Sequence, residues 1–110
     1  MHALTVESEA MERALQSLTP QDRTEILSVG AAFHRLTLKK RLERAERKLQ
    51  EFEARYHATL PQVEAAGLPD NADYTVHEDY VEWHYWSRTL EQTRKALETL
   101  AMFAPEPEPA

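Results

Sequence analysis

The chain has 110 residues, no cysteine, two glycines and a formal net charge of −6. This length suits one domain, and without cysteine the chain has no disulfides and no thiolate metal ligands. The acidic balance argues against binding nucleic acid through net charge. No apolar run of about 18 residues and no signal peptide are recognisable, so we expect a cytoplasmic protein. Turn-forming glycines are too few for a β protein, which predicts the all-α class.

The first predicted helix covers residues 7–18. Ala10, Ala14 and Leu18 recur at intervals of four, which is the spacing of one helix face. We expect Ser8 to cap this helix, because a hydroxyl oxygen accepts a hydrogen bond from a free amide of the first turn. Residues 1–6 are predicted to be a frayed lead-in or a single strand.

The second predicted helix covers residues 20–56, with Thr19 as its N-cap and Pro20 as its first residue. Its apolar residues form two heptad-like series. The first series is Ile26, Val29, Phe33 and Leu36, and the second is Leu38, Leu42, Ala45, Leu49, Phe52 and Tyr56. The phase jumps between the two series, and we interpret this jump as a change of packing partner.

Two further helices are predicted after an interruption. The short one covers residues 60–66, with Thr59 as its cap and Gly67 as a terminating residue of positive φ. The last covers residues 76–103, because Thr75 and Glu78 have the spacing of a capping box, in which each side chain bonds the other's amide. Beyond it, the acidic, proline-rich tail at 105–110 is predicted to be disordered.

This order of elements predicts a single helical domain, residues 1–104, built as a long antiparallel, coiled-coil-like hairpin with a short N-terminal helix. Two helices bury only the surface between them, so we expect apolar side chains on their other faces to be covered by a further element or a second chain. Val81 and Tyr85 lie on a different face from Val76, at about 100° per residue. The prediction is therefore a homodimer in which two hairpins form a helical bundle, with both tryptophans buried at the shared surface.

An aromatic and acidic group in the last helix is the predicted partner-binding surface, since tryptophan and tyrosine are enriched at interface centres. Its residues are Tyr74, His77, Asp79, Tyr80, Trp83, Tyr85 and Trp86. A core cluster is the alternative interpretation. His84, beside the tryptophans, is either a general base or a boundary residue that meets water or a carboxylate.

A metal site is a further alternative, because imidazole and carboxylate together bind zinc or iron. The candidate ligands are His77, Glu78, Glu82 and His84. The two histidines are seven residues apart, about 10 Å along the axis, and the H-E-x-x-H spacing is absent. A helix cap with a solvated acidic first turn explains the same residues, and we expect no cofactor.

One basic stretch offers a nucleic-acid alternative through phosphate contacts. It consists of Lys39, Lys40, Arg41, Arg44, Arg47 and Lys48. Proteins that bind single strands need aromatic side chains on which bases stack, and no aromatic residue interleaves with this stretch. Two other interpretations remain: a solvated face with pairs such as Glu43–Arg47 and Glu51–Arg55, or a basic helix that complements its acidic partner helix.

The segment from Gly67 to Trp86, preceded by Phe52-Glu53-Ala54-Arg55-Tyr56, resembles small uncharacterised prokaryotic helical proteins associated with toxin–antitoxin-like gene pairs. The resemblance covers residues 25–103 and carries no catalytic element. It implies a binding protein, the neutralising member of a pair. Residues 1–35 hold three bases and five acids, which departs from a DNA-binding N-terminus.

We therefore expect a non-enzymatic helical interaction module that forms a homodimer. Its acidic aromatic surface is expected to suit a protein partner with a basic surface. Direct nucleic-acid contact and membrane binding are not expected.

Overall fold

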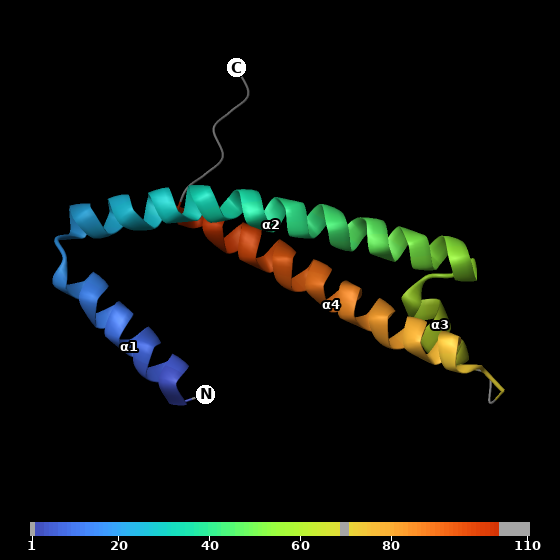
Figure 1. Ribbon diagram of the computed structural model, residues 1–110. Coiled ribbons are helices and arrows are strands. Elements are labelled where there is room, and N and C mark those ends of the chain that lie inside the picture. Colours follow the sequence, from blue (N-terminus) through green and yellow to red (C-terminus); the bar gives the residue numbers. More distant parts are fainter. Residues whose placement is uncertain (1, 69–70, 104–110) are drawn as a thin grey trace, which may run out of the picture.

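The computed structural model of the protein describes residues 2–68 and 71–103, all of whose regular structure is helical. The all-α prediction is therefore confirmed for this part of the chain. The four helices are α1 (His2–Ser17), α2 (Pro20–Tyr56), α3 (Leu60–Ala66) and α4 (Tyr74–Phe103) (Figure 1). The predicted disordered tail, residues 105–110, lies outside the described residues.

Helices α2 and α4 pack side by side and run in opposite directions (Figure 1). At one end, Arg55 of α2 meets Asp79 near the start of α4. At the other end, the Ser28 hydroxyl donates to the carbonyl of Phe103, the last residue of α4, at 3.2 Å. We call these the closed end, which α3 covers, and the open end, from which α1 diverges. The result is a flat molecule of 61 × 46 × 19 Å.

The start of α2 follows the predicted capping chemistry. Thr19 is extended, and its hydroxyl oxygen accepts a hydrogen bond from the Asp22 amide at 3.1 Å, with Pro20 in the first turn. At α3, Thr59 is likewise the N-cap, and it forms a reciprocal capping box with Gln62. These short-range bonds satisfy amides that have no partner within the helix, so they could be predicted from neighbouring residues alone.

Helix α4 begins differently from the prediction. The Asp73 carboxylate accepts a hydrogen bond from the Val76 amide at 3.0 Å, and the helix begins at Tyr74. The predicted capping box of Thr75 and Glu78 is therefore wrong, since Thr75 already lies inside the first turn. An aspartate caps at least as well as a threonine, and here the helix starts two residues earlier than predicted.

Helix α1 also begins earlier than predicted. It starts at His2, so the strand or frayed lead-in predicted for residues 1–6 is wrong for the described positions. Ser8 lies within the helix and is not its cap. The pattern of apolar residues starts only at Ala10, whereas backbone hydrogen bonding extends the helix further toward its N-terminus.

The closed end holds the aromatic core. Trp83 is only 2% exposed, and its ring stacks on Phe52 at 5.6 Å and on Tyr56 at 5.7 Å between ring centroids. Trp86 is buried beside Ala45 in the same cluster. Both tryptophans are therefore covered within one chain, and the expectation that a second chain is needed to bury them is wrong.

The two apolar series of α2 occupy opposite faces. Ala31, Leu38, Ala45 and Phe52 are buried against α4 along the whole contact. Val29 and Leu36 lie roughly 160–180° around the helix from Leu38, at about 100° per residue. We call Ile26, Val29, Phe33 and Leu36 the outer stripe, all of which are more than half exposed. The phase jump therefore marks a change of face, because α4 packs on the second series and its continuation.

Candidate interaction surfaces

The predicted partner-binding residues separate into an inner and an outer set. Asp79, Trp83 and Trp86 are buried, and Tyr80 is partly buried. The core interpretation fits these four, because most of their surface is covered while α2 and α4 stay packed. Tyr74, His77 and Tyr85 are exposed on the outer side of α4.

The outer set lies on a shallow groove that we call the acidic face. The groove is lined by Tyr74, His77, Glu78, Asp79, Val81, Glu82 and Tyr85, and all of these except the buried Asp79 make up the acidic face. Val81 and Tyr85 are 69% and 57% exposed, so neither α1 nor the connection through α3 covers them. Apolar and aromatic side chains flanked by carboxylates suit a partner that combines apolar and basic groups.

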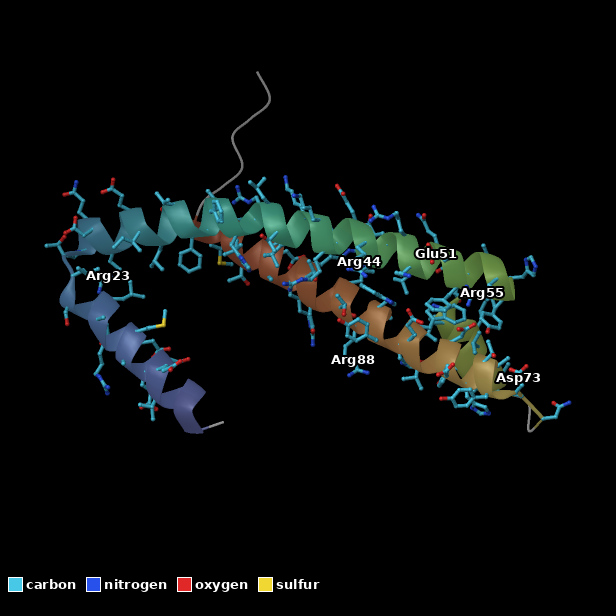
Figure 2. The ribbon with its side chains drawn as sticks, viewed as in Figure 1. Arg23, Arg44, Glu51, Arg55, Asp73 and Arg88 are labelled. Atoms are coloured by element: carbon cyan, nitrogen blue, oxygen red, sulfur yellow. The ribbon has the colours of Figure 1, made fainter. Side chains whose placement is uncertain are left out.

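A buried carboxylate joins the two helices at the closed end. Asp79 accepts hydrogen bonds from the Tyr56 hydroxyl at 2.5 Å and from Arg55 Nη1 at 2.7 Å. Figure 2 shows Arg55 reaching toward α4 from α2. Sequence reasoning missed both donors as partners of Asp79, because they lie 23 and 24 residues away. Only the idea of a basic helix opposite an acidic one pointed toward this contact.

These contacts shift the ionisation of all three groups. The hydrogen bond from Tyr56 is the main cause that lowers the pKa of Asp79 below its usual 3.8; Arg55 adds to it and desolvation opposes it. Burial, followed by the hydrogen bond to Asp79, raises the pKa of Tyr56 above 10.0. The Asp79 carboxylate also raises the pKa of Arg55. The network is therefore most favourable with Asp79 charged and Tyr56 protonated.

Two of the four candidate metal ligands, His84 and Glu82, have other partners. His84 Nε2 lies 2.8 Å from a carboxylate oxygen of Glu64 in α3, and its ring meets Tyr80 edge-on at 4.6 Å. Glu82 accepts a hydrogen bond from Trp86 Nε1 at 3.3 Å. In the described part of the chain, no three histidine or acidic side chains lie close enough to share an ion. His84 therefore occupies a boundary position and connects α4 to α3.

The basic stretch has a different environment from the one predicted. Neither Glu43–Arg47 nor Glu51–Arg55 forms a pair: Glu51 lies 3.8 Å from Lys48, and Arg55 pairs with Asp79 instead. Arg44 reaches toward α4 (Figure 2), where its guanidinium carbon lies 5.3 Å from the centre of the Trp86 ring. Aromatic residues that the local sequence lacks are thus supplied by the neighbouring helix.

A cleft of about 330 Å³ follows from this juxtaposition, and we call it the basic cleft. It is lined by Thr37, Lys40, Arg41, Arg44, Tyr85, Trp86 and Thr89. Lys39, Arg47 and Lys48 of the predicted set do not line it. Three of the six predicted basic residues line the cleft. Only the tertiary structure could show which three, since this depends on which side of α2 faces α4.

The open end contains an apolar groove of about 620 Å³ between α1, α2 and the end of α4, which we call the N-terminal groove. Its lining residues are Met11, Ala14, Leu15, Leu18, Ile26, Leu27, Gly30, Ala31, His34, Leu100 and Phe103. Sequence reasoning recognised the apolar face of α1 but had no signal for its angle to α2. That angle leaves the groove open.

The chain matches no protein-family model, no curated protein and no solved structure. Its resemblance to proteins of toxin–antitoxin-like gene pairs therefore stays a prediction. Among the described residues, no helix combines the length and the apolar character needed to cross a membrane.

Proposed function

We propose that the chain is a non-enzymatic helical interaction module, a coiled-coil-like hairpin that self-associates as a homodimer. The observation that carries this proposal is the outer stripe, in which Phe33 is 76% exposed. Four large apolar side chains at helical spacing form a continuous apolar face, and each gains roughly 1.5–3 kcal/mol when fully buried. Contiguous apolar surface of this kind is typical of a protein interface.

The N-terminal groove supports a second copy as the occupant. The side chains of the outer stripe project from α2, the groove is concave, and Ile26 belongs to both. A two-fold interface needs one surface that complements itself. The outer stripe of one copy could fill the N-terminal groove of the other, and the reverse, because the two surfaces adjoin on each chain. Helix α1 supports the same conclusion, because a 16-residue helix gains most of its stability from packing its apolar face.

Sedimentation velocity across a concentration series tests self-association. The wild-type chain is expected to approach the mass of two chains at micromolar concentration. A Phe33→Glu/Leu36→Glu double variant is expected to remain a single chain, because two buried charges oppose the contact. Gln21→Glu/Gln50→Glu is the control, since it adds the same charge at exposed positions of α2.

Two results would contradict the proposal. One is a wild-type mass of one chain throughout the series. The other is an unchanged association in the double variant, which would exclude the outer stripe as the contact. Circular dichroism of all variants should be the same, because the substituted side chains are exposed in the single chain.

The acidic face supports a second role, in which the dimer binds a basic protein partner in an antitoxin-like manner. Exposed Tyr74, Val81 and Tyr85 supply apolar contact area, and Glu78 and Glu82 supply complementary charge. Affinity capture with the full chain is expected to retain a basic protein. A Tyr74→Ser/Val81→Ser variant should lose that protein, and Phe33→Glu/Leu36→Glu should keep it. Equal capture by the Tyr74→Ser/Val81→Ser variant and the wild type would exclude the acidic face.

A further inference from the structure

The basic cleft lies between the two long helices, and no residue of the outer stripe lines it. Lys40, Arg41 and Arg44 reach it from α2, and no carboxylate lines it. Within the described part of the chain, none of these three side chains has an ion-pair partner. Three positive charges in one concave site, without an internal counter-charge, form an anion-binding surface.

Two features give the cleft a defined shape. Arg44 is held over Trp86, whose indole nitrogen is itself bonded to Glu82. Thr37 and Thr89 add hydroxyl groups from opposite helices. Hydroxyl groups beside arginine and lysine are the usual protein donors to phosphate oxygens.

Tyr85 indicates which anion the cleft suits. Its ring is more than half exposed at the cleft, and it meets the ring of Trp86 edge-on at 5.0 Å between centroids. An acidic peptide would pair with the three cations but would make no use of the exposed Tyr85 ring. A nucleotide uses both, since its phosphate pairs with the cations and its base stacks on an aromatic face.

We infer that the basic cleft binds a short stretch of single-stranded nucleic acid, with phosphates on Lys40, Arg41 and Arg44 and a base on Tyr85. The chain's net charge of −6 opposes long-range attraction, so short-range contacts must carry the affinity. Glu78 and Glu82 precede Tyr85 on α4 and belong to the acidic face. They repel further phosphates and limit the site to a few nucleotides.

Fluorescence anisotropy with a labelled eight-nucleotide oligothymidylate tests this inference at several salt concentrations. Three phosphate contacts predict a slope of about −2 for log affinity against log salt, because each contributes about 0.7 on a single strand. Lys40→Glu and Arg41→Glu are each expected to reduce the slope by about 0.7. Tyr85→Ala should weaken binding roughly 5- to 150-fold, whereas Tyr85→Phe should preserve it.

Arg88→Glu is the matched control, because Arg88 is exposed on α4 and does not line the cleft (Figure 2). It changes net charge by the same amount as Arg41→Glu and should leave affinity nearly unchanged. The inference is overturned if the oligonucleotide fails to bind saturably, or if Arg88→Glu weakens binding as much as Arg41→Glu. It is also overturned if a polyglutamate peptide competes equally and Tyr85→Ala has no effect, which would assign the cleft to an acidic protein segment.

Discussion

The closed and open ends of the α2–α4 pair differ in what lies between the helices. At the closed end, Trp83 stacks on Phe52 and on Tyr56, and Asp79 is joined to α2 by two hydrogen bonds. At the open end, the buried positions are small or polar. The closed end is therefore held by large apolar area and by two bonds to the Asp79 carboxylate, whereas the open end has the hydrogen bond from Ser28 to the Phe103 carbonyl and little apolar area.

Arg35 and Thr93 illustrate the weaker packing away from the closed end. Both are buried, and each has a side-chain nitrogen or oxygen without a hydrogen-bond partner among the described residues. Trp83 Nε1 at the closed end also lacks a partner, but there the stacked rings and the bonds to Asp79 offset its cost. An unsatisfied buried polar group costs about 1–3 kcal/mol. Stability is therefore concentrated at the closed end, whereas the uncovered apolar surface of α1 and α2 lies at the open end, where assembly is proposed.

Trp83→Ala is expected to have the largest effect, a loss of about 3–5 kcal/mol in the free energy of unfolding, because it removes a fully buried ring. Chemical denaturation followed by circular dichroism measures this loss. Phe33→Ala is the matched change at the open end. In dilute solution it should alter stability by no more than about 0.5 kcal/mol, since its ring is exposed. Similar losses in both variants would contradict the comparison.

Tyr56→Phe should destabilise the chain by about 1.5–3 kcal/mol, because it removes one hydroxyl donor to a charged carboxylate and keeps the stacked ring. The same denaturation experiment measures the loss. Tyr74→Phe removes a hydroxyl from an exposed ring and serves as the control. No difference between the two variants would show that Asp79 gains nothing from the Tyr56 contact.

Asp73→Ala should cost about 1 kcal/mol, because Asp73 is the observed N-cap of α4. Thr75→Ala should cost less than about 0.5 kcal/mol, since Thr75 lies inside the first turn. Thermal unfolding distinguishes the two variants. A larger loss for Thr75→Ala than for Asp73→Ala would support the capping box that the sequence predicts.

The pH dependence of the closed end should be the smallest effect, because protonated Asp79 keeps a neutral hydrogen bond. A carboxylate whose folded pKa is lowered stabilises the fold fully above its unfolded pKa, and this contribution disappears as pH falls through the folded value. The stability difference between wild type and Asp79→Asn should therefore be constant from about pH 5 to 8 and shrink below about pH 4. A difference that grows on acidification would contradict the lowered pKa.

The contribution of Tyr56 to stability has the opposite pH dependence, because it is lost as pH rises. Its folded pKa is raised, so its contribution is present below pH 10 and is lost as pH rises through the folded value. Stability measured from about pH 9 to 11 should decline less in Tyr56→Phe than in the wild type.

The sequence determined the helices, because helix period, caps and terminators act between residues only a few positions apart. Thr19, Thr59 and Gly67 were read correctly for this reason. It did not select Asp73 over Thr75, since both have suitable capping chemistry. The stripe of Ile26, Val29, Phe33 and Leu36 was also recognised, but period alone does not tell which of two apolar faces a neighbouring helix covers.

Only the tertiary structure decided the sites. It paired Asp79 with Tyr56, brought Tyr85 to Arg41 and left the outer stripe exposed. The angle at which helices cross depends on side-chain shape across the whole contact, and no local pattern encodes it. The amino-acid sequence therefore predicts the four helices and the caps of α2 and α3, whereas the packing of α4 on one face of α2 decides which residues become core and which remain free to bind.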